Sequence, residues 1–197
     1  KKRGKLWGRI MIKKIHYNAP VILTFTFLAF FAYLLGKWTN DISTMQLFSV
    51  YRSTLKDPLF YIRLFGHVLG HANWEHYMNN FLLILLIGPM LEEKYGSIHM
   101  LIMILFTAFI TGIINIIFFN TALLGASGIV FMLILLSSFA NIKKGTIPLT
   151  LLIVVIIFMG KEVIAGLFFK DSVSQLTHII GGFCGGIFGY KINRTQI

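Results

Sequence analysis

Two residues that lie far apart in the sequence could supply the nucleophile and the base of a hydrolytic site. Ser127 lies between glycines in the segment Gly125–Gly128, and His178 follows later in the chain. A serine hydroxyl becomes an effective nucleophile when a neutral imidazole accepts its proton. Attack on an amide carbonyl also requires donors for the oxygen that becomes negative. A site built on this pair therefore also needs side-chain donors.

His76 and Asn80 are the candidate donors. They are four residues apart and so share one face of a helix. The backbone N–H of Ser127, at the start of a helix, would add a third donor together with the helix dipole. Taken singly, each residue has a simpler explanation, because Asn often links helices, histidine is often satisfied in a core, and serine bonds to helix carbonyls. Only the combination predicts a site.

The elements that position these residues are expected to lie in a membrane. The chain has 197 residues, of which 56% are hydrophobic and 13% charged, whereas a globular domain has about 25% charged residues. The longest stretch without Asp, Glu, Lys or Arg runs from Tyr95 to Ile142 and has 48 residues, and roughly 20 suffice for one crossing. The composition predicts a polytopic membrane protein. Cys184 is the single cysteine, so no internal disulfide can form.

Apolar runs predict six membrane-spanning helices. Their expected ranges are Ala19–Gly36, His76–Leu91, Ile98–Phe119, Ser127–Ala140, Ile147–Gly160 and Val173–Tyr190. With a cytoplasmic N-terminus, 12 of the 18 Lys and Arg residues fall on the inner side. This asymmetry satisfies the positive-inside rule with both termini cytoplasmic. It also explains the net charge of +11 without nucleic-acid binding.

The predicted topology places His76, Ser127 and His178 at a similar depth. Their three helices run from outside to inside, and each residue precedes the first inner charge by 13 to 16 positions. At 1.5 Å per residue, this spacing corresponds to about 20 to 24 Å above the inner boundary. The last helix also carries a glycine every four residues, a pattern that allows helices to approach closely. These glycines, on the face of His178, are Gly181, Gly185 and Gly189.

The connection between the first two spans, Thr39–Glu75, is too long for a simple link. Its apolar residues are interrupted by charges too often for a membrane span. We therefore expect a structured element at the outer interface, with a plain amphipathic anchor as the alternative.

Taken in order, these motifs resemble those of rhomboid intramembrane serine proteases over about residues 60–190. Three motifs match the catalytic elements of the family: Gly125-Ala126-Ser127-Gly128, the H-x-x-x-N motif His76–Asn80, and His178 with Gly181 and Gly185. Two further sets agree: Arg63, His67 and His71 near the end of the first loop, and Glu92 with Gly96. The resemblance implies an all-α bundle of six transmembrane helices with a membrane-inserted first loop. The implied organisation is a basic cytoplasmic segment (1–18), the protease domain (19–190) and a short cytoplasmic tail (191–197).

The resemblance also implies the roles of the site residues. Ser127 would be the nucleophile, His178 the general base and acid, and His76, Asn80 and the Ser127 N–H the oxyanion donors. The site would be a Ser-His dyad, because no carboxylate falls inside the six ranges above to orient His178 as in a triad. The resemblance implies no cofactor or metal. The implied protein is a multi-pass protein of the plasma membrane. It would cut single-span membrane proteins near their outer ends, and no particular oligomeric state is implied.

Two residues depart from the family pattern. Phe131 stands where the family often has a tyrosine that stacks on the catalytic histidine, so stacking is retained without the hydroxyl. Thr177 stands where alanine often precedes that histidine. The segment Lys161–Gln175 would by resemblance cap the site, with the fifth helix as a lateral gate.

The sequence leaves two other functions open. Four histidines could supply imidazoles to a metal transporter or an intramembrane metal site: His67, His71, His76 and His178. That reading lacks an accompanying carboxylate and an H-E-x-x-H motif. A catalytically inactive rhomboid relative that binds membrane clients is the second alternative, although such relatives typically lack the serine or the histidine.

Overall fold

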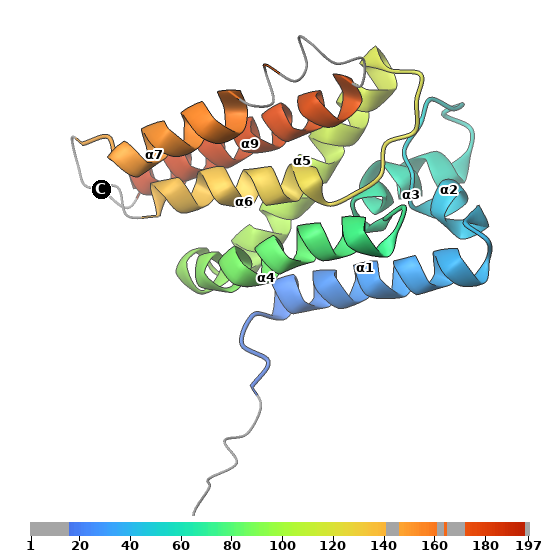
Figure 1. Ribbon diagram of the computed structural model, residues 1–197, viewed down its shortest axis with the longest axis horizontal. Coiled ribbons are helices and arrows are strands. Elements are labelled where there is room, and N and C mark those ends of the chain that lie inside the picture. The colour runs from blue at the N-terminus through green and yellow to red at the C-terminus, as the bar shows by residue number, and fades with distance from the viewer. Residues whose placement is uncertain (1–15, 141–145, 161–163, 165–171, 196–197) are drawn as a thin grey trace, which may run out of the picture.

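The computed structural model of the protein describes residues 16–140, 146–160, 164 and 172–195. Within these residues every regular element is a helix, as expected of an all-α fold (Figure 1). The elements are α1 (Pro20–Trp38), α2 (Ile42–Leu47), α3 (Pro58–Gly66), the 3₁₀ turn η1 (His67–Leu69), α4 (Trp74–Tyr95), α5 (Ser97–Phe118), α6 (Ser127–Phe139), α7 (Leu149–Val154), the π-helical η2 (Val155–Met159) and α9 (Ser172–Thr195).

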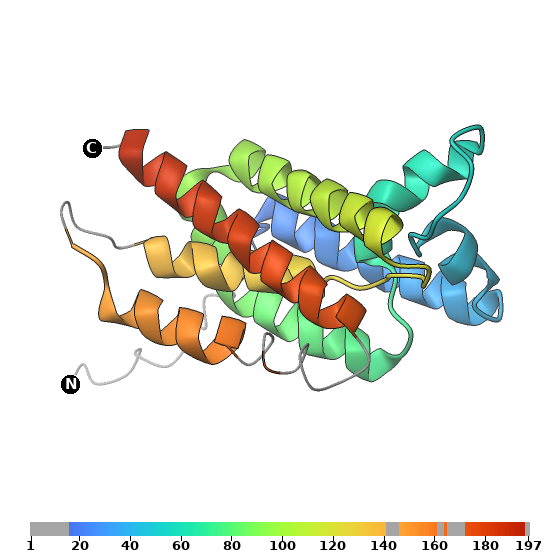
Figure 2. The same cartoon turned by 90° about the horizontal axis from the view of Figure 1, so that it is seen from above.

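The long helices form a bundle in which α4, α6 and α9 all run in the same direction (Figure 1). These are the three helices that carry the candidate site residues, and all three begin toward the end of the bundle where α2 and α3 lie. α1 runs beside α4 in the opposite direction, and α5 crosses behind them. α6 packs most extensively against α9, which lies across it in the view from above (Figure 2).

Glycines create the close packing between α6 and α9. A Cβ added to Gly181 would lie 2.0 Å from the carbonyl oxygen of Gly128. One added to Gly185 would lie 2.1 Å from the carbonyl oxygen of Met132. Because backbone atoms rather than flexible side chains occupy the space, no larger residue fits at either position without moving a helix. This confirms the expectation that the glycine pattern marks a close helix contact.

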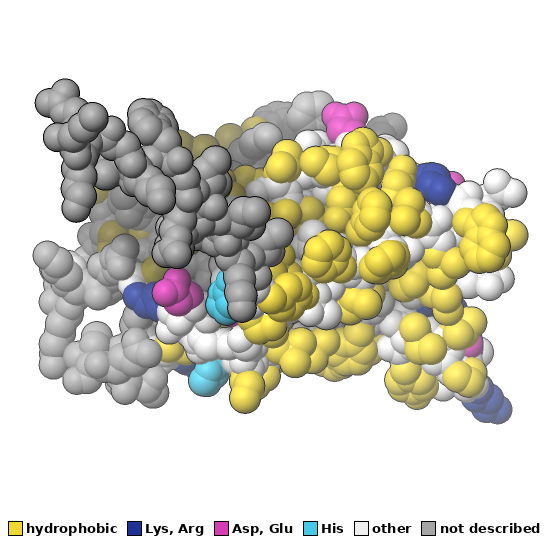
Figure 3. All heavy atoms as spheres, turned by 90° about the horizontal axis from the view of Figure 1, so that it is seen from below, with side chains coloured by type: hydrophobic (Ala, Val, Ile, Leu, Met, Phe, Trp, Pro, Cys, Tyr) yellow, Lys and Arg dark blue, Asp and Glu magenta, His cyan; other side chains and the backbone are white. Residues whose placement is uncertain are grey.

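The outer surface of the bundle is apolar. On α1, side chains such as Phe31, which is 61% exposed, face outward, and hydrophobic side chains cover the middle of the face in Figure 3. Two helices of the described chain, α1 and α5, are long and apolar enough to cross a membrane. Helices also occupy the other four predicted ranges, and their crossing of the membrane remains a prediction.

Two helices are longer than the sequence predicted. α4 continues to Tyr95 and α9 to Thr195, beyond the expected ends at Leu91 and Tyr190. Glu92 therefore lies within α4, with only 3% of its surface exposed. Its carboxylate accepts the N–H groups of Val21 and Ile22, both at 2.9 Å. A buried carboxylate is tolerated here because it satisfies the free N–H groups at the start of α1.

The connection between α1 and α4 is structured, as predicted. Its centre is Arg63, a cation that is only 2% exposed. The guanidinium forms an ion pair with Asp57, donates to Ser53 at 2.9 Å and to the Gln46 carbonyl at 3.3 Å, and lies over the Tyr51 ring. Such a network compensates the cost of burying the charge. The depth of this connection in the membrane remains a prediction.

Candidate active site

Ser127 is the first residue of α6, and the loop in front of it is held by the α1–α4 connection. Leu123 and Val50 exchange two backbone hydrogen bonds of 2.9 Å each. The Gly125 N–H donates to the His67 carbonyl at 2.9 Å. The Asn115 amide of α5 donates to the carbonyls of Val50 and Thr121. The loop that presents Ser127 therefore has a defined backbone position, although it lacks regular secondary structure.

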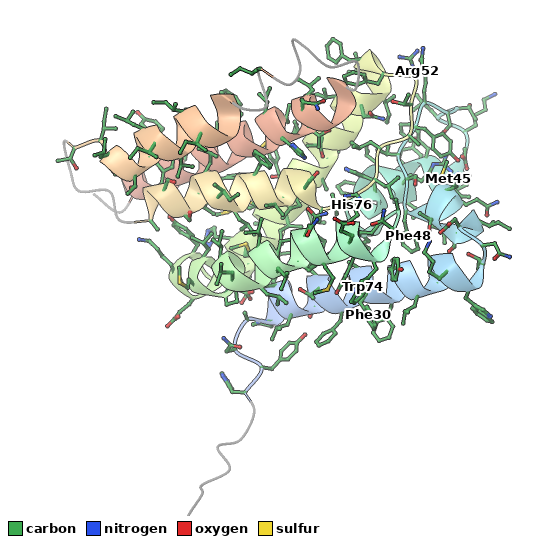
Figure 4. The ribbon with its side chains drawn as sticks, viewed as in Figure 1. Phe30, Met45, Phe48, Arg52, Trp74 and His76 are labelled. Carbon is green, nitrogen blue, oxygen red and sulfur yellow. The ribbon has the colours of Figure 1, made fainter. Side chains whose placement is uncertain are left out.

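His76 lies against this loop, between the first turn of α4 and the start of α6 (Figure 4). A Cβ added to Gly125 would lie 2.7 Å from Nε2 of His76, so the imidazole occupies the space that a side chain would need. Gly125 also has φ +123°, a conformation that strongly favours glycine. The side-chain oxygen of Asn73 accepts the His76 backbone N–H at 2.8 Å and caps α4.

Asn80 lies one turn farther along α4 and is only 6% exposed. Its Nδ2 atom is 3.1 Å from Nε2 of His71. The same Nε2 accepts the Ala126 backbone N–H at 3.4 Å. Asn80 and the residue in front of Ser127 thus share one imidazole partner.

His178 reaches the site from α9. Its ring stacks on Phe131, with 4.4 Å between centroids and 5° between planes. Phe131 follows Ser127 by four residues, so both project from the same face of α6. The stacking expected from the sequence is therefore present. Thr177, beside His178, has its methyl group 3.2 Å from the position of a Cβ on Gly128, so its methyl packs in the α6–α9 contact.

The structure brings all four sequence-predicted residues to the region around the first turn of α6. His76 and Asn80 approach from α4, and His178 stacks one turn below Ser127. Such a set offers a hydroxyl nucleophile, an imidazole base and polar donors, which is the chemistry of acyl transfer.

His71 is the site residue whose role the sequence did not reveal. From the sequence, His71 was expected only to lie near the end of the first loop or to serve as one ligand of a metal site. In the structure it is 1% exposed and its ring lies 4.9 Å from that of His76. Burial, assisted by the neighbouring His76, lowers the pKa of His71 to about 4, so the imidazole is neutral at ordinary pH. The H-x-x-x-H spacing of His67 and His71 was the available signal.

The ring nitrogens of His71 bear on the alternative of a metal site. Both ring nitrogens of His71 have protein partners, since Nδ1 lies 3.1 Å from the Leu69 carbonyl. In the described part of the chain, no three His, Cys, Asp or Glu side chains group as metal ligands would. The expected cap over the site, Lys161–Gln175, lies largely outside the described residues.

Comparison with protein families agrees with this geometry. The family model of the rhomboid domain matches residues 59–195, which include every residue of the candidate site. A search of curated proteins gave no match. Proteins with this domain are integral membrane proteins, generally serine proteases, and act on transmembrane substrates in the lipid bilayer. The chain therefore belongs to the rhomboid family.

Proposed function

We propose that the protein is an intramembrane serine endopeptidase that cuts single-span membrane proteins in or near the outer ends of their transmembrane segments. Ser127 is the nucleophile and His178 is the general base and acid. The observation that carries the proposal is the stacking of His178 on Phe131, 4.4 Å away and one turn from Ser127. That contact fixes the imidazole plane on the face of α6 from which the serine projects.

The reaction would proceed in two halves. Ser127 Oγ attacks the scissile carbonyl carbon while His178 accepts the hydroxyl proton. The tetrahedral intermediate collapses, the C–N bond breaks, and His178 returns that proton to the leaving amine. Water then attacks the acyl-enzyme ester with His178 again as base, which releases the new carboxyl group and restores the serine.

The negative oxygen of each tetrahedral intermediate requires donors. The Ser127 N–H at the start of α6 offers one, and the helix dipole favours negative charge there. His76 and Asn80 offer two more from α4. The absence of a side chain at Gly125 lets the His76 imidazole lie directly against the loop in front of Ser127. A dyad with these donors needs no metal or organic cofactor.

The direct test is labelling by a serine-reactive fluorophosphonate, with cleavage of a single-span model substrate measured in parallel. We expect both to be lost in Ser127→Ala, and cleavage to be lost in His178→Ala, with the melting temperature largely retained. Ser137→Ala is the matched control, because Ser137 lies on the same helix and its hydroxyl donates to the Ile134 carbonyl within that helix at 2.7 Å. It should label and cleave like the native protein.

Other results of these assays would favour one of the alternative functions. Substantial cleavage by Ser127→Ala would refute the serine mechanism. Absence of labelling and cleavage in the native protein, with retained binding of a transmembrane client, would favour the non-catalytic function. Loss of native activity to chelators would favour a metal site.

A further inference from the structure

The environment of His71 defines which of its ring nitrogens carries the proton. Nδ1 lies 3.1 Å from the Leu69 carbonyl, which can only accept a hydrogen bond. Nδ1 is therefore the N–H donor. A neutral imidazole has a single N–H, so Nε2 carries a lone pair and can only accept.

That lone pair determines the orientation of the Asn80 amide. The two amide orientations differ only in which atom, Nδ2 or Oδ1, faces His71. With Oδ1 toward Nε2, two lone pairs would oppose each other in a buried space where water cannot relieve them. With Nδ2 toward Nε2, a hydrogen bond of 3.1 Å forms. His71 thus selects the orientation in which Asn80 presents its nitrogen.

One amide hydrogen then remains for another acceptor. Nδ2 of Asn80 lies 4.0 Å from the position of a Cβ on Gly125, two residues before Ser127. The amide nitrogen therefore faces the loop along which a substrate carbonyl would approach. The opposite amide orientation would place a partly negative oxygen there, and it would repel an oxyanion rather than stabilise it.

The imidazole itself is firmly held. The rings of Tyr77 and Phe81 pack against His71 at centroid distances of 5.5 Å each. The Ala126 N–H also donates to Nε2 at 3.4 Å. One nitrogen therefore links the Asn80 amide of α4 to the backbone directly in front of the nucleophile.

We propose that His71 is a positioning residue that accepts from Asn80 and Ala126 through Nε2, and so aims the second N–H of Asn80 at the oxyanion. This inference rests on the proposed protease function. His71 does not touch the reacting atoms. It acts on the transition state through the orientation of the Asn80 amide.

Two amide substitutions separate this role from simple packing. His71→Gln places an oxygen acceptor near the position of Nε2. His71→Asn retains a group near the position of Nδ1 but is too short to reach Asn80. Each is combined with Asn80→Ala, and kcat, KM and melting temperature are measured with a single-span model substrate. His99→Gln, at an exposed histidine near the start of α5, is the control.

We expect His71→Asn to lower kcat by up to about 100-fold with little change in KM, because a donor is misdirected only in the transition state. His71→Gln should recover most of that loss. The double variant His71→Asn with Asn80→Ala should be no slower than Asn80→Ala, since both remove the same interaction.

Other outcomes overturn the inference. Equal kcat values for His71→Asn and His71→Gln would do so, as would multiplicative losses in the double variant. Failure of both single variants to fold would assign His71 a structural role instead. The protease function is judged separately by fluorophosphonate labelling of the native protein against Ser127→Ala, so each proposal can fail without the other.

Discussion

The contact between Gly181 and Gly128 gives a sharp prediction, because it sets the distance between the helices that carry the proposed nucleophile and the proposed base. In Gly181→Ala the new Cβ would start 2.0 Å from the Gly128 carbonyl oxygen and 2.8 Å from its carbonyl carbon. Ordinary contact begins at 3.4 Å. Both neighbours are backbone atoms, so no rotamer change relieves the clash, and α9 must move by about 1.4 Å relative to α6.

The displacement acts on His178, three residues before Gly181 on the same face of α9. Misplacing a catalytic group by about 1 Å costs roughly 100-fold in rate, and overpacking of this kind costs about 1 to 3 kcal/mol of stability. We therefore expect Gly181→Ala to lose about two orders of magnitude in kcat. The assay is cleavage of a single-span model substrate, with a melting curve to confirm that the variant is folded.

Gly186 provides the matched control on the same helix. A Cβ added there meets nothing within 4 Å. Alanine favours a helix over glycine by about 1 kcal/mol, so Gly186→Ala should retain full activity and be at least as stable as the native protein. If Gly181→Ala cleaved as fast as Gly186→Ala, the helix contact would not position His178 and the reasoning would be wrong.

Further predictions concern the polar contacts that hold the fold. The Arg63 side chain, followed by the Leu59 N–H, holds the pKa of Asp57 below its ordinary value of 3.8. The Asp57 ion pair therefore adds stability above that pH and loses it as the pH falls through the lowered pKa. Asp57→Asn should lower the melting temperature at neutral pH and converge with the native protein in acid; an unchanged difference at all pH values would contradict this. Glu92→Ala should cost roughly 3 kcal/mol in chemical denaturation, because it removes the charged acceptor of two N–H groups of α1. Exposed Glu93→Ala should cost almost nothing, and equal losses in the two variants would refute the assignment.

Much of the architecture follows from local patterns in the sequence. Long apolar runs identified helices at all six expected positions, because a backbone in an apolar environment must satisfy its hydrogen bonds internally and a helix does so within one segment. The spacing of Gly181, Gly185 and Gly189 predicted a close helix contact, which the structure confirms. The helix ends were less well predicted. Leu91 seemed a natural boundary because Glu92 is charged, yet the helix continues through it.

The site could be predicted as a set of residues but not as an arrangement. Residue types and order pointed to Ser127, His178, His76 and Asn80, since few side chains perform acyl transfer. The role of His71 could not be predicted. Its sequence neighbours give no sign that its ring reaches Asn80, nine positions away, and the Ala126 backbone, 55 positions away.

By itself, the amino-acid sequence determined the helical class, the apolar exterior and the chemical groups available for catalysis, because these depend on composition and short-range spacing. The tertiary structure alone decided that Glu92 would be buried against the start of α1, that Val50 would pair with Leu123 in front of Ser127, and that His71 would face Asn80. Each of these contacts joins segments brought together only by the packing of the helices. Hydrogen-bond partners of buried groups depend on that packing, because the same side chain in water would be satisfied without them.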